Sequence, residues 1–295
     1  MNAAPLSCGT PGLFPPMTRF WFHVVASLAL WGGEVIAQQV LGDIIYSING
    51  ESVSIIDYRE QAAGKVVIPA TIDGKPVTSI GNLTFAYCTG VTSVAIPDSV
   101  TSISYSGFNE CTALTAITVE PSHPTFSSVD GILFNKDQTT LIQYPGGKAG
   151  SYTVPNSVTS IREHAFYFCP GLASVTIGNS VTSIGRSAFA RCPGLTGVTI
   201  GNSVASIGQS VFARCAGLTS MTIPGSVTSI GNWAFIDCAK LTSVYFEGNA
   251  PKAGAGLFTG VDAKELKLHI YEGSTGFELA PWGILPRITM KRPGN

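Results

Sequence analysis

The sequence predicts a repeat solenoid, a β-rich fold in which short segments coil one upon the next. The first observation behind this prediction is a 23-residue segment that recurs in six copies, which begin at Val77, Val100, Val158, Val181, Val204 and Val227. The second is that apolar residues recur in every copy at offsets 0, 3, 8, 14, 17 and 19 from the starting valine. A fixed period of this size is typical of units that bury their apolar edges against neighbouring units.

The composition argues against two classes of partner. Only 12% of the 295 residues are charged, and the formal net charge is -1. A nucleic-acid partner requires a basic stripe, and electrostatic membrane binding requires a polybasic patch. Neither is present in the sequence, so we expect no nucleic-acid partner. The 33 glycines and 18 prolines suit a fold that turns every dozen residues.

The beginning of the chain predicts a secretory signal peptide over residues 1–37. Arg19 precedes an apolar run of 14 residues from Phe20 to Gly33, and Val35-Ile36-Ala37 suits cleavage after Ala37. The residues before Met17 indicate a start codon assigned too early. A retained anchor is the alternative, although a membrane span needs about 20 apolar residues. No later run is long enough, so we expect no membrane span after cleavage. The predicted location is secreted or cell-surface, with the periplasm as a further alternative.

Residues 38–76 are predicted to form an N-terminal β cap. Two β-prone runs, Ile44 to Ile48 and Ser52 to Ile56, flank Asn49-Gly50, which is the strongest short hairpin signal. Val66 to Pro69 resembles the end of a repeat and predicts the first rung. A cap is expected because an open solenoid edge would template aggregation.

The repeats are predicted to occupy residues 77–249, and residues 250–295 to form a C-terminal cap. Leu266 to Tyr271 reads as a final strand. Trp282, with Ile284 and Leu285, can cover the last open rung.

Within one repeat, the spacing of apolar residues predicts two short strands and a helical turn. In the copy that begins at Val181, Val198 and Ile200 alternate with polar residues, as in a half-buried strand. A turn then leads into the next copy, whose first four residues form the short second strand. Arg186 to Cys192 is predicted to form the helical turn.

Two rows of core residues follow from this repeat. The phenylalanine at offset 8 is predicted to stack into one aromatic spine: Phe85, Phe108, Phe166, Phe189, Phe212 and Phe235. The cysteine at offset 11 is predicted to form a row of buried free thiols: Cys88, Cys111, Cys169, Cys192, Cys215 and Cys238. Disulfides are the alternative in an exported protein, but they need Cα atoms within about 7 Å and suitably directed side chains. The absence of a Cys-x-x-Cys pair disfavours a metal site.

The copies that begin at Val100 and Val158 are separated by 58 residues, so the chain carries an insert at about residues 120–155. Ile132 to Phe134 and Thr140 to Tyr144 predict a hairpin with a polar turn. Such an insert is either a projecting binding element or a hairpin that only packs on the solenoid.

The repeat pattern Leu-x-x-Val-x-Ile-x-x-Ser-Val-x-x-Ile-Gly-x-x-Ala-Phe-x-x-Cys resembles the BspA-type leucine-rich repeat, a family of bacterial surface and secreted proteins that also occurs in some protozoa. The resemblance covers Val77 to Asn249. It implies a curved right-handed leucine-rich-repeat solenoid with a parallel sheet on one side. It also implies a role in adhesion or in binding proteins outside the cell.

No arrangement of residues in the sequence points to catalysis, a cofactor or a metal. His123, His164 and His269 are not paired with a nucleophile in a known motif. Pro145 to Lys148 reads as a turn rather than a phosphate-binding loop. The acidic residues form no repeated ladder that could chelate calcium. We therefore predict a protein that is not an enzyme.

The candidate binding residues are the side chains that differ between copies at outward offsets. Aromatic residues and arginine are enriched in interface hot spots, although drift at solvent-facing positions is the alternative. These positions hold Tyr87, Tyr105, Arg162, Tyr167, Phe168, Arg186, Arg191, Arg214 and Trp233. Arg191 and Arg214 share offset 10, so we expect them to lie one above the other beside Phe168. The opposite sheet face has a row of threonines that ends at Tyr245: Thr118, Thr153, Thr176, Thr199 and Thr222.

The leading functional hypothesis is an exported, non-enzymatic module for recognition or adhesion, whose partner is an extracellular protein or glycan. The alternative is a structural envelope or periplasmic spacer without a specific ligand. A third hypothesis takes the threonine row as an ice- or crystal-binding plane.

Overall fold

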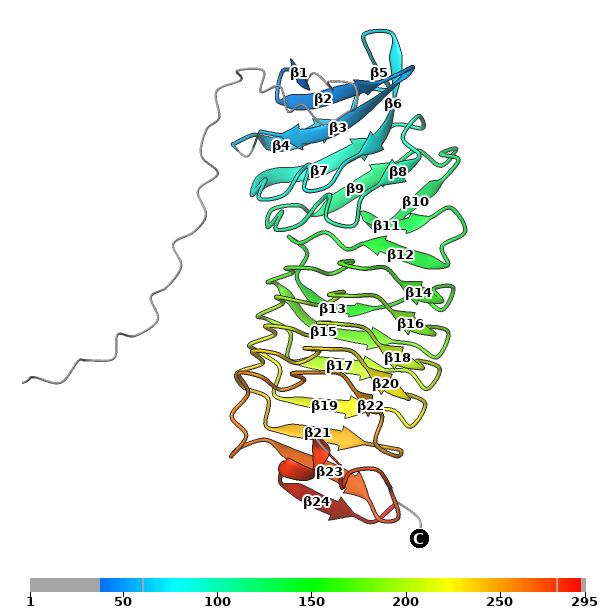
Figure 1. Cartoon of the computed structure of the whole chain (residues 1–295). Coiled ribbons are helices and arrows are strands. Elements are labelled where there is room, and N and C mark those ends of the chain that lie inside the picture. Colours follow the sequence, from blue (N-terminus) through cyan, green and yellow to red (C-terminus); the bar gives the residue numbers. More distant parts are fainter. Residues whose placement is uncertain (1–37, 60, 280, 293–295) are drawn as a thin grey trace, which may run out of the picture. The chain divides into compact units, whose positions relative to one another are not determined.

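A computed structural model describes residues 38–59, 61–279 and 281–292, which form a β-solenoid of stacked coils (Figure 1). The predicted signal peptide and its cleavage site lie outside the described residues. The repeat-solenoid prediction is confirmed by the register, because Ser160 pairs with Ser183, and Ser183 with Ser206, at steps of one 23-residue copy. Over the described residues, no helix has the length and apolarity needed to cross a membrane.

Each coil contributes a longer strand to one side of the stack, which we call the long-strand face. Its strands form three separate sheets, and all pairs within them are parallel. They are β4 (Ala63–Val67), β7 (Gly90–Ile96) and β9 (Ala116–Val119); β13 (Gly150–Thr153), β15 (Leu172–Ile177) and β17 (Gly197–Ile200); and β19 (Ser220–Ile223), β21 (Ser243–Phe246), β23 (Lys267–Tyr271) and β24 (Arg287–Met290).

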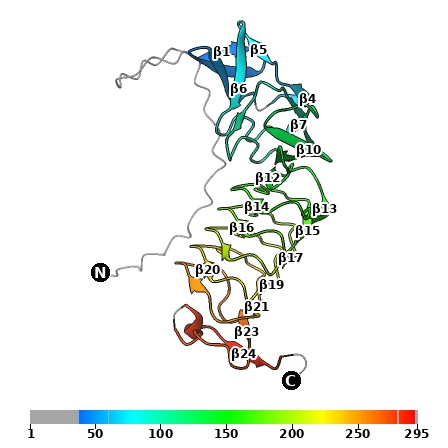
Figure 2. The same cartoon turned by 90° about the vertical axis from the view of Figure 1, so that its right-hand side faces the viewer.

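A second side of the stack, the short-strand face, consists mainly of two-residue strands at offsets 2 and 3. Its members are β3 (Ser52–Tyr58), β6 (Lys75–Ile80) and β8 (Ser102–Ile103), then β12 (Thr140–Gln143), β14 (Ser160–Ile161), β16 (Ser183–Ile184), β18 (Ser206–Ile207), β20 (Ser229–Ile230) and β22 (Lys252–Ala253). At the N-terminal end, β1 (Gln38–Leu41) and β2 (Ile44–Asn49) extend this sheet in antiparallel fashion, and β5 (Thr71–Ile72) pairs with β6. The two faces run along the stack in Figures 1 and 2.

We call the third side of the stack the turn edge. It consists of tight turns, whereas the sequence predicts a helical turn in each copy. Residues 186–192 form tight turns, and the only helix in the described chain is the 3-10 helix η1 (Trp282–Ile284). The prediction was wrong because alternate N–H groups bond to the next coil: Ser187 to the Gln209 carbonyl at 2.9 Å and Phe189 to the Val211 carbonyl at 3.0 Å. An α-helix needs those donors for its own i−4 carbonyls.

The spine phenylalanines point inward, and all six are at most 2% exposed. Their rings stack from Phe166 to Phe189 at 4.6 Å and onward at 5.6 Å through Phe212 and Phe235. The spine is divided, however, because the Phe85–Phe108 stack does not continue to Phe166. The core therefore consists of two hydrophobic clusters, and the boundary between them lies within the insert.

The insert lies in line with the stack. Strand β10 (Phe126–Val129), β11 (Ile132–Asn135) and β12 form an antiparallel meander, and β12 pairs in parallel with β14. At the turn edge the insert contributes only a short segment of chain. In this segment the Tyr144 ring stacks on Phe166 at 4.9 Å. A Cβ on Gly146 would lie 2.9 Å from the Cys111 carbonyl oxygen and 3.2 Å from that of Phe168. The turns of two copies that are 58 residues apart therefore become neighbours at this point.

The 23-residue register continues past residue 249. Lys252 pairs with Ser229, and the Phe258 ring stacks on Phe235 at 5.6 Å. Trp282 is buried against this coil, and its indole N–H donates to the Pro251 carbonyl at 3.2 Å.

Candidate functional site

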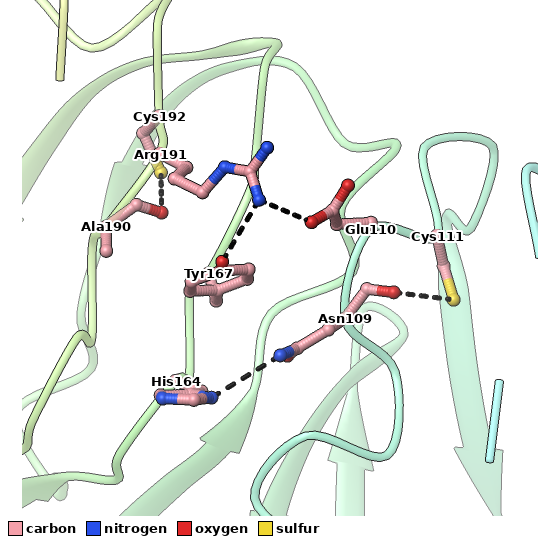
Figure 3. A network of polar contacts seen from close by, with 8 residues as sticks. All are labelled: Asn109, Glu110, Cys111, His164, Tyr167, Ala190, Arg191 and Cys192. Atoms are coloured by element: carbon pink, nitrogen blue, oxygen red, sulfur yellow. Dashed lines mark hydrogen bonds and ion pairs between the residues drawn. The ribbon is translucent and has the colours of Figure 1, made fainter. Parts of the chain in front are cut away.

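The turn edge gathers a cluster of polar and aromatic side chains where the turns of the Val100 and Val158 copies meet (Figure 3). Arg191 lies at its centre. One guanidinium nitrogen of Arg191 donates to Glu110 Oε1 at 2.7 Å and lies 3.3 Å from the Tyr167 hydroxyl. The guanidinium carbon also lies 5.1 Å from the centre of the Phe168 ring. We call Tyr87, Glu110, Tyr167, Phe168 and Arg191 the Arg191 cluster.

The repeat itself positions this cluster. Tyr87, Glu110, Phe168 and Arg191 all stand at offset 10 of their copies, so the coil geometry aligns them in one column. Because the insert adds almost nothing at the turn edge, Glu110 and Phe168 are neighbours in this column. Arg191 can therefore span Phe168 and reach Glu110.

Partial burial makes the Arg191 ion pair stronger than an ordinary surface pair. The side chain of Arg191 is 36% exposed and that of Glu110 is 13% exposed. Burial alone would lower the pKa of Arg191, but the Tyr167 hydrogen bond, together with Glu110 and Tyr87, raises it above its ordinary value. The arginine is thus held as a cation beside aromatic rings, of which Tyr87 is 47% exposed.

A second group of contacts lies beside the Arg191 cluster. His164 Nδ1 lies 3.3 Å from Ser106 Oγ and 3.4 Å from Asn109 Nδ2, and its ring stacks on Tyr167 at 5.1 Å. Burial lowers the pKa of His164, which favours the neutral imidazole. The Asn109 side chain is buried, and its Oδ1 has no hydrogen-bond partner.

Tyr105 and Arg162 form a third contact across the same junction. The Arg162 guanidinium carbon lies 4.3 Å from the centre of the Tyr105 ring, and Arg162 donates to the Ile103 carbonyl at 2.6 Å. Half of the Tyr105 surface is exposed. Burial lowers the pKa of Arg162.

The remaining candidates lie elsewhere. Arg214 lies in the turn next to Arg191, since the Arg191 N–H donates to the Ala213 carbonyl at 2.7 Å, and its guanidinium pairs with Asp237 of the following coil at 3.3 Å. Trp233 is 42% exposed at offset 6, farther along the turn edge. Tyr245 lies on the long-strand face, where its ring stacks on His269 at 4.2 Å. The sequence interpretation missed Glu110, although its place at offset 10 was a usable signal.

Most of these candidates share an unusual backbone conformation. Tyr87, Phe168, Arg191, Arg214 and Trp233 all have positive φ, between 54° and 65°. A non-glycine residue in this conformation destabilises the folded chain by roughly 1 kcal/mol or more, whereas glycine at the same position would not. The seventh coil does use glycine at the same two offsets, Gly256 and Gly260. Large side chains at these offsets are therefore not required for making the turn.

The cysteine row lies in the interior beside the turn edge. All six cysteines are buried, and Cys111, Cys169, Cys192, Cys215 and Cys238 form no disulfide. The thiols of Cys192, Cys215 and Cys238 each donate to a phenylalanine carbonyl of the preceding coil at 3.0 Å. Burial is the leading cause that raises the pKa of Cys192. The thiols thus serve as neutral hydrogen-bond donors between coils, a role that the sequence interpretation did not include.

The turn edge offers groups that can form hydrogen bonds, ion pairs and ring stacks. Among the residues that the structure describes, no group of three or more His, Cys, Asp or Glu side chains could hold a metal ion. The Arg191 cluster offers a cation, a carboxylate and aromatic rings, two of them tyrosines with hydroxyl groups. This combination is typical of interface hot spots.

The fold and its repeat define the chain as a leucine-rich-repeat solenoid. The family model for the BspA type leucine rich repeat region matches residues 65–146 and 144–264 with six copies, and the chain belongs to this family.

Solved structures with a similar fold include the pneumococcal vaccine antigen PcpA, at a TM-score of 0.50 and 17% identity over 88% of this chain and 100% of that one. A leucine rich cell surface protein from Faecalibacterium prausnitzii is similar at a TM-score of 0.48 and 21% identity, over 71% and 88% of the two chains. No curated protein sequence matches the chain.

Proposed function

We propose that this chain is an exported, non-enzymatic recognition or adhesion module that binds a protein or glycan at or outside the cell surface through its turn edge. The observation that supports this most is the set of aromatic and arginine side chains at left-handed positions. Glycine would relieve the backbone strain at each of them, and the exposed rings of Tyr87 and Trp233 offer surface that a partner could cover. Membership of the BspA-type family agrees with this role.

The Arg191 cluster is the proposed centre of the binding surface. Its ion pair and stacked rings hold Arg191, Tyr167 and Phe168 in fixed positions before a partner arrives. Such preorganisation reduces the entropy lost on binding. Tyr87 and Tyr105 are half exposed and supply the area that a partner could cover.

The test is a binding array of extracellular matrix proteins and glycans, probed with the chain from Gln38 onward. We expect Tyr87→Gly combined with Trp233→Gly to lose the bound partner. The matched control is Ser187→Gly combined with Ser210→Gly, because these residues share the left-handed conformation but have small side chains. Arrays without any bound partner would instead favour the structural spacer without a specific ligand.

Export is tested separately. N-terminal sequencing of the protein recovered outside the cytoplasm should begin at Gln38, as cleavage after Ala37 predicts. Recovery only from the cytoplasm, with the first residues intact, would contradict the export proposal.

A further inference from the structure

The parallel ladder of the long-strand face is interrupted between β17 and β19. Across closed ladders, the threonine at offset 15 donates its backbone N–H to the preceding coil at 2.9 Å, as Thr196 does to Ala173 and Thr242 to Thr219. Thr219 makes no such bond to Thr196, and no hydrogen-bonded pairing joins β17 to β19 among the described strands. Backbone donors and acceptors are therefore left open between these two strands.

A groove borders this interruption, and most of its lining comes from β15, β17 and the turns that follow them, with Thr222 from β19. Val198 is half-buried, whereas Val175 and Val244, at the same offset in coils with closed ladders, are at most 1% exposed. A cavity of about 540 Å³ opens there, which is within the range of roughly 300–1,000 Å³ of ligand pockets. The open ladder, the exposed valine and the cavity coincide at one rung.

The lining of the groove combines polar groups with the apolar side chains of Ile177, Val198 and Ile200, and carries no cation and no aromatic ring. It includes the hydroxyls of Thr176, Thr199 and Thr222, the amides of Asn179 and Asn202, and the carboxylate of Glu247. A ligand hydroxyl can both donate to and accept from such groups and the open backbone. The Glu247 carboxylate accepts from a hydroxyl but repels an anion.

We propose that this groove binds a neutral saccharide unit through the Thr199 and Thr222 hydroxyls and the open backbone of β17 and β19. A peptide strand does not fit between these strands, because insertion would require about two strand spacings, roughly 9.5 Å. The coils stay together on their other sides, where β16 pairs with β18 and the Phe189 and Phe212 rings stack at 5.6 Å. The site lies on a different face from the Arg191 cluster and goes beyond the function proposed for the turn edge.

The experiment is a backbone-amide NMR titration of the chain from Gln38 with maltotriose, cellotriose, chitotriose and mannotriose. We expect at least one of these neutral trisaccharides to shift amides in residues 176–179, 198–202 and 219–223. Thr199→Val combined with Thr222→Val should weaken that binding about tenfold or more, because two hydrogen bonds are lost.

The matched control is Thr118→Val combined with Thr153→Val, since these threonines lie in the same row and flank the other break, between β9 and β13, but do not line the groove. The control should bind as the unmodified chain does. The proposal is overturned if no trisaccharide shifts these amides, if binding maps elsewhere, or if the threonine substitutions at the groove have no effect.

Discussion

Arg191 donates to the Glu110 carboxylate at 2.7 Å although 81 positions separate the two residues in the chain. The contact joins the two parts of the solenoid between which the phenylalanine spine is interrupted. It depends on the insert, which extends both strand faces but leaves the turns of the Val100 and Val158 copies adjacent. The ion pair therefore fastens the junction as well as preparing the proposed binding surface.

Arg191→Ala should lower the free energy of unfolding by about 1.5–3 kcal/mol, because it leaves the mostly buried Glu110 without its charged partner. The control is Arg214→Ala, whose pair with Asp237 is 64% and 45% exposed, and which should change stability by less than about 1 kcal/mol. Urea unfolding measures both. Equal losses for the two variants would mean that the junction contact is no stronger than a surface pair.

Phe189→Ala should lower the free energy of unfolding by about 3–5 kcal/mol through the cavity it creates. Phe189 is fully buried and stacks on both sides, against Phe166 and Phe212. Phe168→Ala, at a half-buried position, is the control and should have a smaller effect. An unchanged thermal melt for Phe189→Ala would contradict the account of the core.

The half-buried histidine at the junction, His164, predicts a pH dependence of stability. The pKa of His164 is lowered in the folded chain from the ordinary value of 6.5. The unfolded chain therefore binds more protons below pH 6.5, and stability should fall as the pH decreases from 6.5 toward the folded pKa. His164→Gln should flatten this part of the profile, measured by urea unfolding at a series of pH values. A profile as steep as that of the unmodified chain would exclude His164 as a cause.

The six described cysteines should resist alkylation in the folded chain. Their side chains are buried, and burial raises the pKa of Cys111 and Cys238, so little thiolate is present to react. Mass spectrometry after iodoacetamide treatment should show labelling only once the chain is unfolded. Bridged pairs in the non-reduced chain would contradict the free-thiol row.

The sequence predicted the strands and core well, because both depend on a strict local period. Phe189 and Cys192 recur at fixed offsets, so their interior positions follow from stacking equivalent residues. The helical turn was wrong because no local pattern reveals that the Ser187 and Phe189 N–H groups bond to the next coil. The seventh coil escaped notice because Ala250 and Ala253 replace the valine and isoleucine of the other copies.

The candidate site was only partly accessible from the sequence. A shared offset placed Phe168 beside Arg191, which the structure shows. The contact with Glu110 depends on how the insert passes the turn edge, and no spacing in the sequence reveals that. The interruption at Thr219 was also hidden, since this residue occupies an ordinary repeat position.

At the turn edge, large side chains occupy positions whose positive φ favours glycine. Tyr87 allows the most direct test of whether these side chains are needed for the fold. The measurement is the free energy of unfolding of Tyr87→Gly beside Tyr87→Ala. Since φ is 65° at this position, the glycine variant should be at least as stable as the unmodified chain and about 1 kcal/mol more stable than the alanine variant. A glycine variant that is less stable than both would show that Tyr87 serves the fold, and would contradict the account.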